Sequence, residues 1–347
     1  MSKVGRQTWK FSRGASVLAT GTVAGTVEGK GPLGTDFDLR ISDDHFGEPS
    51  WEKAEQKLFE SAAKIALDKV SLSDGDLDLI VGGDLNAQLS SFYFGLRAYS
   101  TPLIGTYGAC STVTESLAVA AMAIDSNNVN YALVGTSSHN STAERQFRYP
   151  TEYGVQKPPT AQRTVTGSGV VVLGSKPFGE MRITHATIGK LVDMGISSPW
   201  EMGAAMAPAA FDTIQAFFRE SGMKPKDFDC IATGDLGYIG HELLAEMFRD
   251  AGMDLGERLT DCGMLIYDRE QPEVYSGGSG GACCSLVTFG HLLDNLSSGV
   301  WNRMLVCATG ALLSSVTVQQ GETVPGICHA VAFERVSAEN TDGGTKS

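Results

Sequence analysis

Positive charge is scarce in this chain. Its 347 residues include 27 Lys and Arg against 40 Asp and Glu, which gives a formal net charge of −13. No block rich in Lys and Arg interrupts this acidic composition, so we expect no nucleic-acid partner. Because the protein as a whole is acidic, an anion could bind only where basic residues are gathered locally.

Long apolar runs are also missing. No uncharged window reaches the length of a membrane span, and residues 1–11 lack an apolar stretch of signal-peptide length. We therefore expect a cytoplasmic protein, or one that associates peripherally with a membrane. The seven cysteines lack paired metal-ligand spacing, so we expect reduced, mostly buried thiols and no metal site.

One sequence pattern occurs twice. Residues 76–85 (DLDLIVGGDL) reappear as residues 227–236 (DFDCIATGDL), and each copy follows an amphipathic helical pattern. Three positions downstream correspond at one constant offset: Gly108, Cys110 and Thr136 match Gly281, Cys283 and Thr309. Two motifs with a shared offset favour a duplication, and we place the two halves at residues 1–176 and 177–347.

The order of the expected elements predicts an α/β fold. Strands alternate with helices, which favours a largely parallel sheet with helical crossovers. Residues 113–124 are apolar nearly all round, as expected for a helix between two sheets. Thr112 and Glu115 fit a capping box at its start, and the matching helix should cover about residues 285–296. We therefore expect five layers in the order αβαβα.

Cys110 is the residue in a reactive-looking position. It lies just before the buried helix, near the positive end of the helix dipole, where a thiolate would be stabilised. A duplicated α/β half with a cysteine at this place resembles the thiolase and ketoacyl-synthase superfamily, which implies the five-layered fold and a homodimer.

A closer resemblance covers almost the whole chain. Residues 31–34 (GPLG), 136–154 (TSSHNSTAERQFRYPTEYG), 202–210 (MGAAMAPAA) and 303–314 (RMLVCATGALLS) resemble the stage V sporulation protein AD family. That resemblance implies binding of dipicolinic acid and its uptake into the developing forespore. It also implies partners among the other stage V sporulation proteins of a complex at the spore inner membrane.

The catalytic set of the superfamily is incomplete in this chain. Cys110 stands at the nucleophile position, but residues 233–236 (TGDL) lack the synthase histidine and residues 276–281 (SGGSGG) lack the synthase asparagine. The C-terminal thiolase cysteine would fall in residues 320–325 (QGETVP), whereas Cys328 belongs on or beside the last strand. A positioned base contributes roughly 10²–10⁴ in rate, so we expect binding without catalysis.

An enzymatic alternative stays open. It is an acyltransferase or condensing enzyme that acts on an acyl-CoA or carrier thioester through Cys110, with His139 or His329 as a rearranged base.

A pocket for dipicolinate, a planar aromatic dianion, needs cationic or N–H donors and a flat slot. Arg145 and Arg148 are interleaved with aromatic residues in residues 144–150 (ERQFRYP), where ligand contact and salt bridging within the loop both stay open. Ser279 and Gly280 belong to a glycine-rich run before a helix, which can present N–H groups to a carboxylate or serve close backbone packing.

Two further strand ends carry candidate ligands. Ser138 and His139 follow a strand, where α/β sheets place ligands, although a lone histidine is more often structural. Asp84 and Asp235 occupy equivalent strand ends; we prefer helix capping for both, with contact to calcium or to the pyridine nitrogen as the alternative. We expect no cofactor, and whether calcium enters with dipicolinate stays open.

Overall fold

The structure is a computed structural model that describes residues 2–147, 157–175 and 180–336. Arg148 and the expected boundary between the two halves lie outside these residues, so both stay predictions. In the first half the elements are β1 (Ser2–Lys3), β2 (Thr8–Ala24), β3 (Leu39–Arg40), α1 (Trp51–Lys69), β4 (Leu79–Gly83), α2 (Ser90–Gly95), β5 (Leu103–Gly105), α3 (Thr112–Asp125), β6 (Tyr131–Ser138), α4 (Asn140–Phe147), β7 (Arg163–Thr164) and β8 (Gly167–Gly174).

The second half repeats this order with local additions. Its elements are β9 (Met181–Thr187), α5 (Met202–Ser221), β10 (Cys230–Thr233), α6 (Gly237–Asp250), β11 (Leu259–Asp261), α7 (Cys262–Leu265), β12 (Gly278–Ser279), α8 (Gly281–Val287), α9 (Leu293–Ser297), β13 (Arg303–Ala311), α10 (Ser315–Gln319) and β14 (Gly326–Arg335). Strand order in the sheet is β5-β4-β6-β8-β2 for the first half and β11-β10-β13-β14-β9 for the second. Each of these five strands therefore has a counterpart at the same place in the other half.

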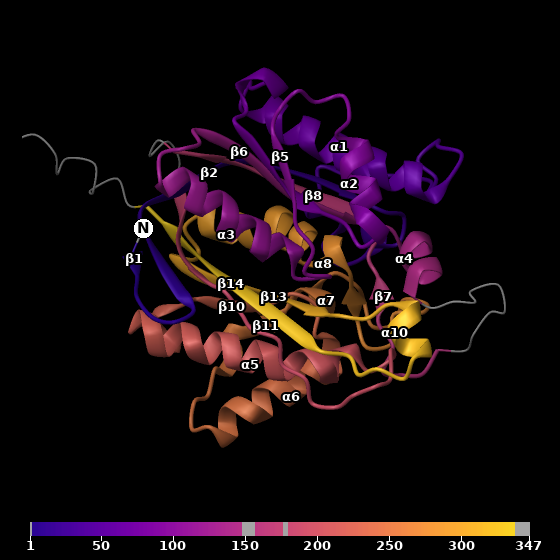
Figure 1. Cartoon of the computed structure of the whole chain (residues 1–347), viewed down its shortest axis with the longest axis vertical. Helices are drawn as coiled ribbons and strands as arrows, with labels where there is room; N and C mark the ends of the chain where they lie inside the picture. The colour runs from indigo at the N-terminus through magenta and orange to yellow at the C-terminus, as the bar shows by residue number, and fades with distance from the viewer. Residues whose placement is uncertain (1, 148–156, 176–179, 337–347) are drawn as a thin grey trace, which may run out of the picture.

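The layers are those expected from the sequence. Figure 1 shows α1 and α2 outside one half-sheet, α3 and α8 in the middle, and α5 and α6 outside the other half-sheet. The central layer lies in the largest apolar core, because α3 and α8 bury side chains against both half-sheets. The five-layered αβαβα fold is thus confirmed. The two half-sheets are also joined edge to edge, because β2 pairs with β9.

Strand direction differs from the expected largely parallel sheet. β4 is parallel to β5 and β6, and β10 is parallel to β11 and β13. β8 and β14, however, run antiparallel to both of their neighbours. Antiparallel neighbours need no helical crossover, and α10, between β13 and β14, is too short to cover a sheet. The sheet is therefore mixed.

The starts of the two central helices also differ from expectation. Ser111 precedes α3 without a side-chain cap. Thr112 Oγ1 instead accepts the Gly108 N–H and donates to the Ala109 carbonyl, so it is not part of a capping box. Glu115 Oε2 is buried without a hydrogen-bond partner among the described residues, and burial raises its pKa.

The second central helix starts earlier than the pattern suggested. α8 begins at Gly281, and a π-helical turn at Thr288–Leu292 joins it to α9. Cys283 therefore lies inside the first helical turn, whereas Cys110 lies before its helix. Of the helices in the described part of the chain, none combines the length and apolar character needed to cross a membrane.

Candidate functional site

A small cavity lies between the halves, at the ends of β6 and β13 where Cys110 is placed. The volume of the cavity is about 40 Å³, which is room for roughly three water molecules. Polar groups at its wall come from Cys110, Thr164 and Ser279. The rest of the wall is mainly apolar: Leu85, Ala143, Phe147, Pro199, Met202 and Leu313. We call this space the Cys110 cavity.

The turn before α3 carries Cys110 to the cavity wall. Ala109 has a φ of 52°, a left-handed conformation that reverses the chain before the helix begins. Cys110 is 7% exposed, and its Sγ lies 3.8 Å from Ser279 Oγ. The first-half cysteine therefore meets the glycine-rich run of the second half.

Asp235 stands directly behind Ser279. Ser279 Oγ donates to Asp235 Oδ2 over 2.9 Å, and the Gly280 N–H donates to the same oxygen over 3.1 Å. Thr309 Oγ1 donates to Asp235 Oδ1 over 2.8 Å. The backbone N–H of Gly280, which we considered as a donor for a ligand carboxylate, is thus engaged by a buried side chain.

Burial changes the acid–base properties of this group. It raises the pKa of Asp235 to about 6. Burial and the neighbouring Asp235 carboxylate raise the pKa of the Cys110 thiol well above its ordinary value. The expectation of a stabilised thiolate is therefore wrong. The charge of Asp235 and the burial of the thiol raise its pKa by more than the helix end lowers it. The arrangement can hold a neutral thiol and, near pH 6, a carboxylic acid that donates a hydrogen bond.

The histidines considered as a base are neutral and engaged elsewhere. His139 Nε2 lies 2.9 Å from the Asp44 carbonyl, and its Nδ1 accepts the Ser141 N–H over 3.1 Å. Burial lowers the pKa of His139 and lowers that of His329 to about 4. Neither residue lines the Cys110 cavity, so neither is placed to take a proton from the thiol.

The hydroxyl group of Ser138 bonds to two backbone groups. Its Oγ donates to the Val165 carbonyl over 2.7 Å and accepts the Ala282 N–H over 3.0 Å. The latter bond satisfies a backbone donor in the first turn of α8, a place where helices need such an acceptor. Ser138 thus joins the end of β6 to the start of the second central helix.

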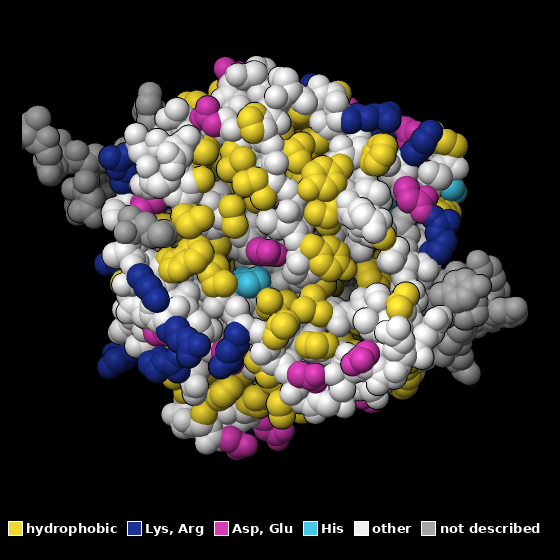
Figure 2. All heavy atoms as spheres, in the orientation of Figure 1, with side chains coloured by type: hydrophobic (Ala, Val, Ile, Leu, Met, Phe, Trp, Pro, Cys, Tyr) yellow, Lys and Arg dark blue, Asp and Glu magenta, His cyan; other side chains and the backbone are white. Residues whose placement is uncertain are grey.

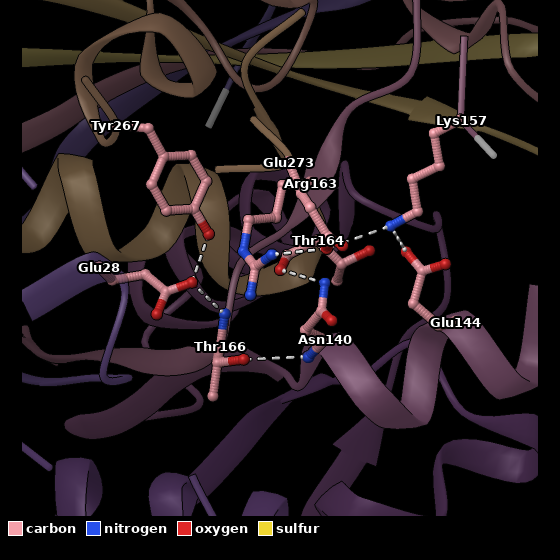
Figure 3. A network of polar contacts seen from close by, with 9 residues as sticks. All are labelled: Glu28, Asn140, Glu144, Lys157, Arg163, Thr164, Thr166, Tyr267 and Glu273. Carbon is pink, nitrogen blue, oxygen red and sulfur yellow. Dashed lines mark hydrogen bonds and ion pairs between the residues drawn. The ribbon is translucent and has the colours of Figure 1, made fainter. Parts of the chain in front are cut away.

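Within the described residues, the cations near the cavity already have carboxylate partners. Arg145, on α4, forms an ion pair with Glu52. Figure 3 shows that Lys157 reaches both Glu144 and Glu273; the two Nζ–Oε distances are 3.3 and 3.9 Å. Arg163 contacts the same Glu273 over 3.1 Å. None of these cations lines the cavity.

The same network positions one wall of the cavity. Asn140 Nδ2 donates to the Thr164 carbonyl over 3.2 Å, and the Asn140 N–H donates to Thr166 Oγ1 over 3.0 Å. Figure 3 shows these bonds between α4 and the segment that leads into β8. Thr164 is therefore held against the start of α4, whose Ala143 and Phe147 form part of the same cavity.

Asp84 adopts a capping geometry. Its two carboxylate oxygens accept the N–H groups of Asn86 and Phe92, each over 2.6 Å. Burial raises its pKa to about 6. Its neighbour Glu55, fully buried on α1, accepts bonds from Asn86, Ser137 and Thr142. Burial and the Asp84 charge raise the pKa of Glu55 to about 8.

Sequence reasoning missed Glu55 and underestimated Asp235. Glu55 is an acid on the apolar face of α1, three positions before Leu58, and that placement was a readable signal. Asp235 falls in the segment where the synthases have their histidine, which was a second signal. Within residues 2–147, 157–175 and 180–336, no cluster of three or more His, Cys, Asp or Glu side chains could hold a metal ion.

Solved structures share this fold. 3-Oxoacyl-[acyl-carrier-protein] synthase III from Aquifex aeolicus VF5 is 16% identical, with a TM-score of 0.57 over 92% of this chain and 100% of that chain. Human mitochondrial 3-ketoacyl-CoA thiolase, in complex with CoA, is 14% identical, with a TM-score of 0.59 over 94% of this chain and 99% of that chain. At these identities the likeness concerns the fold alone.

Sequence relatives are more specific. Stage V sporulation protein AD of Bacillus subtilis (strain 168) is 47% identical over 335 residues, which cover 96% of this chain and 98% of that protein. The model of the family Stage V sporulation protein AD matches residues 5–334. The chain therefore belongs to the stage V sporulation protein AD family.

Proposed function

We propose that this protein binds dipicolinic acid without catalysis, in the Cys110 cavity, and takes part in its uptake into the developing forespore. It does so with other stage V sporulation proteins of a complex at the spore inner membrane. Membership of the stage V sporulation protein AD family supports the proposal. No helix in the described residues is suited to cross a membrane, so in this proposal the association is peripheral.

One observation carries the preference for binding over catalysis. The thiol at the nucleophile position faces a buried carboxyl group, Asp235, where a synthase has its base. An acid at this place disfavours the thiolate instead of generating it. The cavity is retained while the chemistry that would use the thiol is disabled.

The cavity suits the ring of the ligand better than its charges. Leu85, Phe147 and Met202 offer apolar surface for a flat aromatic ring. Ser279 Oγ is the polar group at the wall that can meet a carboxylate: when Asp235 is protonated, the acid can donate to Ser279 Oγ, and the hydroxyl hydrogen is then free to donate to the ligand. The ligand is larger than the open volume of the cavity, so side chains of its wall must move when it enters.

Calorimetry tests the proposal directly. Dipicolinate and isomeric pyridine dicarboxylates are titrated into the protein, with and without calcium. We expect saturable binding with a clear preference for dipicolinate. No heat, or equal affinity for every isomer, refutes the proposal. Binding only in the presence of calcium would identify the chelate as the ligand.

A matched pair of cysteine variants locates the site. Cys110→Ala removes a cavity wall and should weaken binding about fivefold, equivalent to ~1 kcal/mol of lost packing. Cys283→Ala removes the equivalent thiol of the other half, which donates to the Gly234 carbonyl, and should leave affinity unchanged. Equal effects of the two changes would place the ligand elsewhere.

Acyl transfer remains a second candidate because the thiol itself is retained at the cavity wall. Incubation with acyl-CoA followed by intact mass measurement separates the two functions. A stable adduct that disappears in Cys110→Ser would establish the enzyme, and an unmodified mass supports binding.

We also propose a homodimer formed through the edge of the first half-sheet. β5 is the end strand of its half-sheet, and four large apolar side chains around it are 41–56% exposed: Tyr93, Phe94, Ile104 and Tyr107. Figure 2 shows hydrophobic side chains gathered over the face that carries β5 and α3, with most charges towards its rim. An apolar patch of this kind is typical of a protein interface.

A further inference from the structure

A second cavity opens where the two halves meet. The register of β2 against β9 shifts between Lys10 and Ala15, so residues 11–14 bulge from the ladder. The cavity beside this bulge has a volume of about 290 Å³. We call it the seam pocket and define it by its titratable wall: Lys10, Arg13, Arg182, His185, Arg303 and Glu334.

The wall of the seam pocket is strongly cationic. Its four Lys and Arg side chains face one carboxylate, Glu334, which accepts a bond from Arg303 Nε over 2.9 Å. Arg13 donates to a neutral acceptor, Asn127 Oδ1, over 2.9 Å. Among the described residues, neither Lys10 nor Arg182 has a carboxylate within ion-pair distance. In the part of the chain that the structure describes, three of the four cations at this wall therefore lack an ion-pair partner, on a protein whose net charge is −13.

The bulge that carries Arg13 and directly follows Lys10 is held in place. Asp125, the last residue of α3, accepts the Arg13 N–H over 2.7 Å and the Gly14 N–H over 3.2 Å. Gly14 has a φ of 75°, and a Cβ there would lie 2.6 Å from the Ile183 carbonyl oxygen. The turn therefore requires glycine. Lys10 and Arg13 are presented by a defined backbone shape, anchored to the central layer.

His185 forms a neutral floor of the pocket. It is buried, and its Nδ1 lies 3.0 Å from Thr184 Oγ1. Burial lowers its pKa; the negative charge of Glu334 opposes this effect, and the positive charges of Lys10 and Arg303, each with a smaller effect than Glu334, act in the same direction as burial. Charged side chains of three strands, β2, β13 and β14, thus act on His185.

We propose that the seam pocket binds a small oxyanion with two or more negative charges, either a phosphate or a dicarboxylate. Uncompensated cations at the wall of a cavity favour such a ligand, because guanidinium groups pair with two anionic oxygens at once. A volume of about 290 Å³ is close to the lower end of the range for small-molecule sites. The site is separate from the Cys110 cavity, with which it shares no lining residue.

Titration calorimetry at constant ionic strength tests this site, with inorganic phosphate and dipicolinate as separate probes. We expect the unmodified protein to bind at least one of the two saturably. Arg182→Gln and Lys10→Gln should each weaken that binding about tenfold or more, the effect expected for one charged hydrogen bond. Arg182→Lys keeps the charge and should retain most of the affinity, which separates charge loss from misfolding.

Two controls assign the signal to the seam pocket. Lys64→Gln removes an exposed cation on α1, paired with Asp68, and should leave binding unchanged. Cys110→Ala should leave phosphate binding unchanged. The proposal is overturned if neither probe binds, or if both Gln variants bind as tightly as the unmodified protein. Because the phosphate titration does not involve dipicolinate, its outcome is independent of the function proposed above.

Discussion

Replacing Asp235 by Asn should strengthen dipicolinate binding at neutral and alkaline pH. In the native protein the Asp235 carboxyl group lies behind Ser279 at the wall of the Cys110 cavity, and burial raises its pKa to about 6. Above that pH it is ionised and repels a dianion. Below it the carboxylic acid is neutral and can donate a hydrogen bond. Asn keeps an acceptor for Ser279 and Gly280 but carries no charge.

The size of the effect follows from two independent estimates. Two unit charges ~6 Å apart in a medium of effective dielectric constant ~20 repel by about 3 kcal/mol. If the ligand binds only the protonated form, affinity falls tenfold per pH unit above the pKa of Asp235, which is about 6; this amounts to roughly 100-fold, or ~2.7 kcal/mol, by pH 8. The two estimates agree. Asp235→Asn should therefore bind up to about 100-fold more tightly than the native protein at pH 8.

Calorimetry between pH 5 and pH 8, in buffers of different ionisation enthalpy, measures both the affinity and the protons taken up. The native protein should take up close to one proton per ligand at pH 8, and Asp235→Asn should take up none. Asp84→Asn is the matched control, because Asp84 occupies the equivalent strand end but accepts backbone N–H groups; it should retain the pH dependence. An Asp235→Asn variant with the native pH dependence would refute the placement of the ligand beside Asp235.

Three further predictions concern other groups. Glu55 has its pKa raised to about 8 in the folded state against about 4.5 when unfolded, so its bound proton stabilises the fold fully below pH 4.5. That contribution is lost as pH rises to 8, at up to ~1.4 kcal/mol per pH unit; Glu55→Gln should flatten this part of the stability curve in urea titrations, and an unchanged curve would contradict it. Cys110 should react with iodoacetamide at pH 7 at least about tenfold more slowly in the native protein than in the unfolded chain, as measured by peptide mass spectrometry, and an equal rate would show an accessible thiolate. Phe94→Glu or Ile104→Glu should shift the dimer towards monomer in light scattering after size exclusion. Val300→Glu, at a site 66% exposed between α9 and β13 of the second half, should not; a monomeric unmodified protein would remove the basis of the dimer proposal.

Local patterns in the sequence were sufficient for the main elements of the fold. The largely apolar runs at residues 131–136 (YALVGT) and 304–309 (MLVCAT) are the cores of β6 and β13. The uniformly apolar run after Cys110 is the central helix α3, and Cys328 lies on the last strand, β14. Each of these features depends on burial of a continuous apolar stretch, which the order of residues records directly.

Partners of polar side chains could not be predicted in the same way. Arg145 pairs with Glu52 of α1, more than ninety positions earlier in the chain. Glu115 fits the spacing of a capping box, yet Thr112 bonds backward to residues of the preceding turn. Strand direction could not be predicted either. β8 and β14 are largely apolar on both faces, and this pattern is the same in a parallel and in an antiparallel strand. These outcomes depend on tertiary neighbours, which spacing along the chain does not record.

The duplicated scaffold explains why one of two equivalent aspartates bonds to the wall of the Cys110 cavity, through Ser279. In the first half Asp84 itself accepts the N–H groups at the start of the following helical segment. In the second half Asp261, at the end of β11, accepts the N–H groups of Leu236 and Gly237 over 2.8 and 3.0 Å. Asp235 is thereby released from capping and turns to Ser279, Gly280 and Thr309. An acid outside the cavity, Asp261, thus leaves a titratable group, Asp235, next to Cys110, and the two halves have different chemistry on a similar backbone.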